Sequence, residues 1–329
     1  MGIEVTVEGL SKAFGPQTIW RDVTLTLPAG EVSVMLGPSG TGKTVFLKSL
    51  IGLLKPETGR VLVDGVDMVN DPDRKVFAMR KKFGLMFQDG AMFGSMNLYD
   101  NIAFPLREHT RKTEKEIRRI VLEQMDVVGL LGEERKLPGQ ISGGMRKRAG
   151  LARALVMDPE IILCDEPDSG LDPVRTAYIS QLLIDVNARI DATMLIVTHN
   201  IEIASTVPDN IGMLFLRDLV AFGPREVLLT SEEPVVGQFL RGNRHGPIGM
   251  TEEKDAAKLE EEARAADTLG PVRPIHIPPQ LRPSPGLPAR AAEARHAAAV
   301  DAILPTLSHA AQHAIRENRA HLNQTGGLT

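Results

Sequence analysis

Alternating apolar and polar positions open the chain and predict strands. The stretches "IEVTV" (residues 3–7) and "TIWRDVTLTL" (18–27) alternate as half-buried strands do, with apolar side chains mostly at every second position. The run "EVSVMLG" (31–37) is continuously apolar and ends at a glycine. We interpret residues 1–36 as antiparallel strand material.

Helices and strands then alternate along the chain. "VFLKSLIGLL" (45–54) has helical spacing and is followed by the turn "KPETG" (55–59). Further strands are expected within residues 60–65, 82–88, 160–167, 192–200 and 211–216. Such alternation of helices with buried apolar strands predicts an α/β fold with a mainly parallel sheet.

A helical insert is predicted at about residues 90–157. Its clearest element is "TEKEIRRIVLEQMDVVGL" (113–130), where Thr113 and Glu116 have the spacing of a capping box. Apolar residues recur behind this cap at helical spacing up to Gly129.

The composition shifts after about Arg241, and we place a domain boundary between residues 1–242 and an extension, 243–329. Residues 251–267 predict an acidic helix with a Glu260–Arg264 pair, residues 270–288 are rich in proline, and an Ala-rich helical stretch covers 289–323. The proline-rich part should be extended rather than packed. The extension is either disordered or an arm that contacts another subunit, and its mixed helical composition favours the arm.

Charge and cysteine content narrow the function classes. The chain has 329 residues, 43% hydrophobic and 24% charged, with a formal net charge of −4. A protein that binds duplex nucleic acid usually has a basic excess, so we expect no nucleic-acid partner. One cysteine excludes an intramolecular disulfide. No apolar run approaches the ~20 residues that span a bilayer, and no signal peptide is recognisable at the start.

A phosphate-binding loop follows the apolar run 31–37. The stretch "GPSGTGKT" matches the full P-loop pattern, in which backbone N–H groups surround phosphate oxygens. The lysine of this pattern reaches the β- and γ-phosphates, and the hydroxyl residue binds Mg²⁺. Its residues, with the one after it, are the expected nucleotide contacts: Gly37, Pro38, Ser39, Gly40, Thr41, Gly42, Lys43, Thr44 and Val45.

Two acids and a histidine end the apolar segments that follow. Asp165 and Glu166 close "IILCDE", and an acid at this position beside a P-loop usually holds Mg²⁺, while its neighbour can orient and deprotonate a water. Cys164 lies inside the same run, so we interpret it as a core residue rather than a nucleophile. His199 ends "LIVTH", and on this pattern alone such a histidine is more often a turn residue than a catalytic group.

Together these motifs resemble the ATP-binding subunits of ABC transporters over residues 1 to about 240. Phe14 matches the aromatic residue that stacks on adenine, Gln88 the Q-loop, and Asp172 the end of the D-loop. "SGGM", which contains Ser142, Gly143, Gly144 and Met145, matches the signature motif. The resemblance implies a P-loop NTPase with a RecA-like sheet, an antiparallel β subdomain, a helical insert and a helical or extended C-terminal extension.

The resemblance also implies how such a protein works. ATP lies between the P-loop of one subunit and the signature of a second, and a homodimer at the cytoplasmic face of the plasma membrane drives integral-membrane permeases. Glu166, His199, Lys43 and Gln88 take catalytic roles in this scheme, and Thr44, Gln88 and Asp165 hold Mg²⁺. The apolar segment 90–106 is compatible with a docking groove for a permease helix.

Met145 departs from the glutamine that usually ends the signature. The N–H groups that would bind phosphate survive this change, so we expect altered nucleotide contacts rather than inactivity. "SGGM" followed by basic residues resembles the ATPases that serve MCE-domain lipid transporters, which implies MCE-domain partners and a lipid cargo. Two alternatives remain at this point: an importer of another solute, and an ABC ATPase with no transport role.

Overall fold

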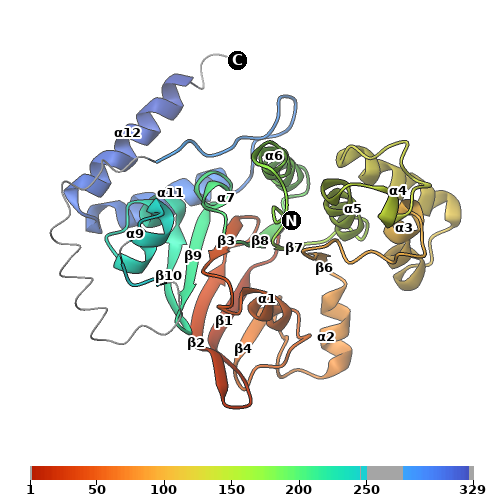
Figure 1. Ribbon diagram of the computed structural model, residues 1–329, viewed down its shortest axis with the longest axis horizontal. Coiled ribbons are helices and arrows are strands. Elements are labelled where there is room, and N and C mark those ends of the chain that lie inside the picture. The colour runs from red at the N-terminus through yellow and green to blue at the C-terminus, as the bar shows by residue number, and fades with distance from the viewer. Residues whose placement is uncertain (1, 245, 250–276, 326–329) are drawn as a thin grey trace.

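The computed structural model describes residues 2–244, 246–249 and 277–325, which contain two sheets and the helices around them (Figure 1). The smaller sheet has the strand order β2-β1-β4-β5, and its paired strands run antiparallel. Its strands are β1 (Val5–Phe14), β2 (Gln17–Leu27), β4 (Thr58–Val63) and β5 (Val66–Asp67).

The larger sheet has the order β10-β9-β3-β8-β7-β6 and is parallel except for β10. The mainly parallel sheet is therefore confirmed. Its strands are β3 (Val32–Leu36), β6 (Phe83–Met86), β7 (Ile161–Asp165), β8 (Thr193–Val197), β9 (Asn210–Phe215) and β10 (Asp218–Pro224).

The antiparallel interpretation of residues 1–36 holds for β1 and β2 but is wrong for β3. Val34 of β3 lies opposite Ile196 of β8 and Ile211 of β9, and both pairings are parallel. All five residues of β3 are buried. A strand covered on both faces is continuously apolar, which is typical of parallel sheets and explains why this run does not alternate.

Helices cover the parallel sheet and form the insert. Figure 1 shows the insert helices grouped beside the β6 edge of the sheet. They are α3 (Leu98–His109), α4 (Glu114–Val127) and α5 (Gly143–Leu155), with a 3₁₀ turn, η1 (Pro138–Gln140), before α5. The capping box at Thr113 and Glu116 is present in α4. The other helices of this part are α1 (Lys43–Leu50), α2 (Asp73–Arg80), α6 (Pro173–Ile190), α7 (Ile201–Thr206), α8 (Arg225–Leu229) and α9 (Pro234–Arg241).

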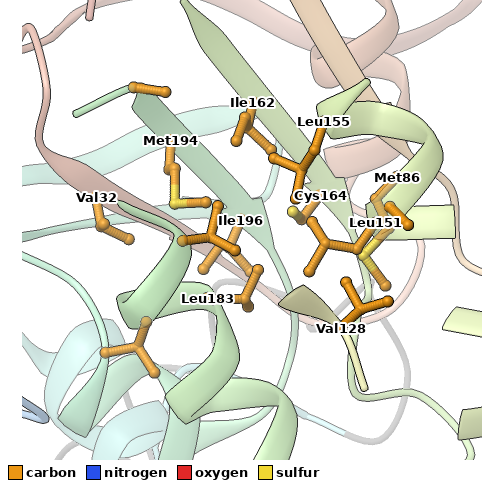
Figure 2. Packing of buried hydrophobic residues seen from close by; sticks show 14 of the residues in the cluster. Val32, Met86, Val128, Leu151, Leu155, Ile162, Cys164, Leu183, Met194 and Ile196 are labelled. Atoms are coloured by element: carbon orange, nitrogen blue, oxygen red, sulfur yellow. The ribbon is translucent and has the colours of Figure 1, made fainter. Parts of the chain in front are cut away.

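Two hydrophobic clusters lie on opposite faces of the parallel sheet. Along β7, Ile162 and Cys164 belong to the cluster beneath the insert and α6, whereas Ile161 and Leu163 belong to the cluster shared with α1 and the small sheet. Figure 2 shows Cys164 among apolar side chains, with Leu151 of α5 close by. Burial raises the pKa of the Cys164 thiol to about 12, as expected for a core residue.

The described part of the extension packs against the preceding residues of its own chain. Residues 277–284 contain no helix or strand and are followed by a turn in which Gly286 has a φ of +89°, and the expectation that this segment is not packed is wrong. Ile277 is buried, and the Leu281 N–H donates to the Thr206 carbonyl at 2.8 Å. Two helices follow where one Ala-rich stretch was predicted, α11 (Glu293–Ile303) and α12 (His309–Thr325), separated by the proline-containing turn η2 (Leu304–Thr306).

Two further sequence-based expectations are not tested by the described residues. The acidic helix at 251–267 and its Glu260–Arg264 pair lie outside the described residues. Contact of the extension with a second subunit stays a prediction. Over the described ranges, no helix is both long and apolar enough to cross a membrane.

Candidate nucleotide site

The P-loop connects β3 to α1, and the surrounding structure requires glycine at two of its positions. A Cβ at Gly42, whose φ is +83°, would come within 2.2 Å of Ile19 Cγ2. A Cβ at Gly37 would come within 2.4 Å of the Leu214 carbonyl oxygen. Ser39 and Gly40 are exposed between them. The loop is therefore fixed against β2 and β9 while its outer side remains open to a ligand.

Lys43 is a buried cation at the start of α1. Its Nζ donates to the carbonyl oxygens of Gly37 at 2.7 Å and Pro38 at 2.8 Å, and no ion pair to a carboxylate is formed among the described residues. Burial lowers the pKa of Lys43, and the charges of Glu166 and Asp165 oppose this only in part. An arriving phosphate would replace neutral carbonyls with a charged partner, which is a stronger hydrogen-bond acceptor.

Asp165 lies next to Thr44 at the end of β7. The Thr44 hydroxyl donates to Asp165 Oδ1 at 2.9 Å. Burial raises the pKa of Asp165; the Thr44 hydrogen bond counteracts this, and the neighbouring charge of Glu166 adds to it. Because burial disfavours the charged form of the Asp165 carboxylate, a cation bound beside it would stabilise that form.

The donor set around Asp165 fits Mg²⁺. This ion is typically held by one or two carboxylates, a hydroxyl and the phosphates of the substrate, not by an all-protein cage. Consistent with that, the described residues contain no group of three or more His, Cys, Asp or Glu that could hold a metal. Gln88 follows β6, which pairs in parallel with β7, so it leaves the same edge of the sheet as Asp165 and Glu166.

Glu166 and His199 meet above this edge. His199 Nδ1 lies 3.3 Å from Glu166 Oε1, and the side chains are 51% and 19% exposed, so a water can reach both. Glu166 has a φ of +45°, and its N–H donates to the Val197 carbonyl at 2.8 Å. The sequence did not predict this contact between the two side chains. The left-handed backbone of Glu166 turns its carboxylate out of the strand direction.

The signature residues form the N-terminus of α5. Ser142 is the cap, and its hydroxyl accepts from the Met145 N–H at 3.2 Å. Gly143 and Gly144 have no left-handed φ, and a Cβ on either would meet no atom of the chain closer than 3.5 Å. The fold itself therefore does not require glycine at these two positions.

Met145 lies in a cavity of about 410 Å³ formed with α4 and α6. No P-loop residue lines this cavity. No hydrogen bond among the described residues connects Ser142 with Lys43, Thr44 or Asp165.

The remaining predicted nucleotide contacts lie apart from this centre. Phe14 is 47% exposed at the end of β1, with Lys12 Nζ 5.0 Å from its ring centroid. Asp172 caps α6 by accepting from the Arg175 N–H at 3.0 Å. Val45 is half-buried and packs against the core beneath the small sheet. An adenine contact for Phe14 and a nucleotide contact for Asp172 or Val45 stay predictions.

One contact residue was missed from sequence. Lys147 of α5 is buried, and its Nζ donates to the carbonyl oxygens of Gln88 at 2.7 Å and Glu166 at 2.9 Å. In the sequence it is the middle of "RKR" (146–148), a basic run that normally indicates a solvated helix face. Its burial depends on how α5 packs, which no local pattern shows.

A groove of about 450 Å³ lies between the sheet and the insert. Its apolar lining includes several aromatic rings, and Phe93 and Phe104 contact each other at a tilt of 57° with ring centroids 5.0 Å apart. Basic side chains also line it: Arg80, Lys81, His109 and Arg153. The segment 90–106 therefore contributes to both the core, through Leu98 and Ile102, and the groove.

Comparison with known proteins identifies the class that this fold and site define. Residues 20–169 match the family model described as "ABC transporter". A relative from Mycobacterium leprae, "Probable ribonucleotide transport ATP-binding protein mkl", is 64% identical over 97% of this chain and 93% of its own length. "Intermembrane phospholipid transport system ATP-binding protein MlaF" from Haemophilus influenzae is 38% identical over 74% of this chain and 92% of its own.

Solved structures agree on the fold. The ATP-binding cassette MJ0796, in a dimeric post-hydrolysis state bound to ADP and Pi, superposes with a TM-score of 0.63 at 29% identity, covering 67% of this chain and 98% of that one. The chain belongs to the ABC transporter family. It is an ATP-binding subunit of such a transporter, an ATPase coupled to transport, and is similar to the Mkl and MlaF branch.

Proposed function

We propose that two copies of the chain form a head-to-tail dimer that binds ATP between the P-loop of one copy and residues 142–144 of the other. The observation that carries this proposal is the pair Gly143 and Gly144, where the fold itself leaves room for a Cβ. The first N–H groups of a helix have no acceptor within it, and the helix dipole favours an anion there. Close approach of a phosphate from another chain accounts for both the glycines and the free N–H groups.

Hydrolysis in this dimer uses the residues at the carboxyl edge of the sheet. Lys43 turns from the carbonyls of Gly37 and Pro38 to the phosphates. Glu166 accepts a proton from the attacking water. His199 contacts both that carboxylate and the γ-phosphate and so positions them relative to each other. Thr44, Asp165 and Gln88 would hold Mg²⁺, which when bound supplies positive charge against the phosphate oxygens.

The groove beside the insert is the proposed docking site for the permeases. Its aromatic lining suits an amphipathic helix, and its basic rim suits acidic side chains on that helix. Phe87 lines the groove, and the next residue is Gln88, so docking and the nucleotide site are one residue apart along the chain. A subunit docked in this way would lie at the cytoplasmic face of the membrane.

The proposed cargo is lipid, carried together with MCE-domain proteins. The resemblance of "SGGM" and its basic run to that branch and the phospholipid named for the MlaF relatives support this assignment. The mkl relatives carry a different cargo in their name, ribonucleotides, which makes an importer of another solute the second candidate.

Co-purification from native membranes separates the candidates. The tagged full chain is extracted in mild detergent, and the proteins retained with it are identified by mass spectrometry, with the groove variant Phe93→Asp as the matched control. Multi-spanning permeases and MCE-domain proteins retained by wild type but lost from the variant are expected. A soluble solute-binding protein with unrelated permeases would overturn the lipid assignment, and retention of no membrane protein would overturn the docking proposal.

A further inference from the structure

Lys147 occupies an unusual position for a lysine. It is 5% exposed, although lysine is rarely buried without a paired acid. Its ammonium group has three N–H donors, and three acceptors surround it: the Gln88 carbonyl at 2.7 Å, the Glu166 carbonyl at 2.9 Å and the Ser169 hydroxyl at 3.2 Å. None of the three is a carboxylate oxygen. Two of the acceptors are backbone carbonyls and the third is a side-chain hydroxyl, so the lysine joins three chain segments by direct hydrogen bonds, while the nearby carboxylates, Asp168 foremost, act on its charge without contacting it.

We propose that Lys147 is a positioning residue that links the loop 87–91, at the permease groove, to the backbone of the catalytic Glu166. The inference rests on the proposed function for the identity of the groove's occupant. The link to Glu166 itself follows from contacts within the chain.

On the Glu166 side, the contact restrains an uncommon backbone conformation. Glu166 is a non-glycine residue with φ at +45°, a region that costs free energy unless surrounding contacts hold it. Its N–H is held by the Val197 carbonyl, and its carbonyl accepts from Lys147 and, at 3.2 Å, from the Ser169 N–H. Removing the ammonium leaves the carbonyl side with the longer contact alone. The direction of the Glu166 carboxylate would then be less restricted.

On the groove side, the same helix fastens the loop 87–91. Arg153 donates to the Gly90 carbonyl at 2.7 Å and the Ala91 carbonyl at 2.8 Å, and a Cβ on Gly150 would lie 3.2 Å from Gly90 Cα. The loop therefore moves with α5 and not independently of it. Lys147 is the residue of α5 that contacts both this loop and Glu166.

Helix α5 therefore connects three parts of the molecule: the signature glycines, Glu166 and the loop at the groove. The N-terminus of α5 carries Gly143 and Gly144, its middle holds Glu166 through Lys147, and the same lysine holds Gln88 beside the groove lining. A displacement of the loop by a docked helix would reach Glu166 through one side chain. Phosphate contact, groove occupancy and carboxylate position then depend on one another.

The test compares Lys147→Met with Arg148→Met in the full chain. Methionine keeps the length and apolar stem of lysine but has no donor. Arg148, one residue on, donates only to the carbonyls of Val128 and Gly129 within the insert and serves as the control for general damage to α5. Steady-state ATP hydrolysis gives kcat and KM, and binding of a fluorescent ATP analogue gives Kd.

Lys147→Met is expected to lower kcat about 30-fold, because a misplaced proton acceptor loses much of its effect, while KM and Kd stay within about threefold. Hydrogen exchange should increase in 87–91 and 166–169 together, and Lys147→Arg, which keeps the charge and the donors, should recover most of kcat. Arg148→Met should show neither change. If Lys147→Met does not fold, Lys147→Gln is judged by the same criteria.

An unchanged kcat, a loss equal to that of Arg148→Met, or a loss confined to KM would overturn the link to Glu166. Hydrogen exchange that increases in only one of the two segments would overturn the connection between them. None of these measurements involves a permease, so they succeed or fail independently of the proposed docking. In a complex with its permeases, Lys147→Met should also lose any change in turnover that docking causes in wild type.

Discussion

Two buried groups of charged residues lie at opposite ends of the parallel sheet, and they differ in whether their partners are present. The front group, at the carboxyl ends of the strands, consists of Lys43, Asp165 and Glu166. The rear group, which we call the rear cluster, lies where β9 begins and beneath α11. It consists of Asp209, Arg225, Glu226, Arg290 and His296. Strand β3 connects the two, since its first N–H donates to Asp209 Oδ2 at 2.8 Å and its end enters the P-loop.

In the rear cluster every charge has a partner. Arg290 forms a two-pronged contact with Asp209, and its Nε donates to Asn187 Oδ1 at 2.6 Å. Burial alone would raise the pKa of Glu226, but the His296 hydrogen bond and the Arg225 charge outweigh it and lower that pKa to about 2. Burial would likewise lower the pKa of His296, and the contact with Glu226 raises it instead.

In the front group, by contrast, the effect of burial outweighs that of the neighbouring charges. Burial is the dominant influence on Lys43 and Asp165, so the lysine pKa is lowered and the aspartate pKa is raised. In the proposed mechanism a bound phosphate and a cation would supply the missing charges. Buried charge alone does not identify a functional site, and neither does a missing charged partner, because Glu31 beside the rear cluster is also buried with only Asn210 as its side-chain partner, and burial raises its pKa.

The largest expected effect is a loss of ATP hydrolysis, without a loss of stability, in a variant of the front group. Glu166→Gln should reduce ATP hydrolysis at least ~100-fold, the usual scale for removing a positioned proton acceptor. Its carboxylate contacts only the His199 ring among the hydrogen bonds of the described chain, so the thermal midpoint should hardly change. ATP binding and the melting curve are measured alongside turnover. Near-normal turnover would remove Glu166 from its proposed role.

For the rear cluster we expect the reverse: a loss of stability with little change in ATP hydrolysis. Arg290→Ala leaves Asp209 buried without its cation, which should cost about 3–5 kcal/mol of unfolding free energy. Turnover per folded molecule should stay near wild type. Denaturant unfolding checks the first value, and Arg295→Ala, which removes an exposed arginine that donates to the Ala29 carbonyl, is the control with little loss. Equal losses in both variants would mean that the extension is held by general packing and not by the rear cluster.

The smallest effect is a pH dependence of the rear cluster. The Glu226 pKa is about 2 when folded and near 4.5 otherwise, so its contribution is present above about 4.5 and is lost as pH falls towards 2. The His296 pKa is raised above 6.5, so its contribution is present below 6.5 and declines as pH rises through the folded value. Wild type should therefore lose stability as pH rises above 6.5, and His296→Gln should lose less. An identical slope in both proteins would contradict this assignment.

Sequence patterns point to the residues of the front group because each of its parts is a short local motif. The P-loop glycines, the Asp165–Glu166 pair and His199 each follow an apolar run, and parallel strands bring such ends to one edge. The rear cluster joins Asp209 to a residue 81 positions away, and Lys147 meets a loop 59 positions away. Such contacts arise from helix packing and have no local signature, which is also why the proline-rich segment 277–288 was expected to be unpacked.

In the proposed dimer each nucleotide site is shared between two chains. Two inactive variants test it when mixed: Lys43→Ala, which removes the phosphate-binding lysine, and Gly143→Asp, which places a negative charge at the signature. Each alone should be inactive, because every site in its dimer has one damaged half. An equal mixture should recover roughly a quarter of wild-type turnover, since half of the dimers are mixed and each of these holds one intact site. A mixture that stays as inactive as its components would contradict the shared site and place P-loop and signature function within one chain.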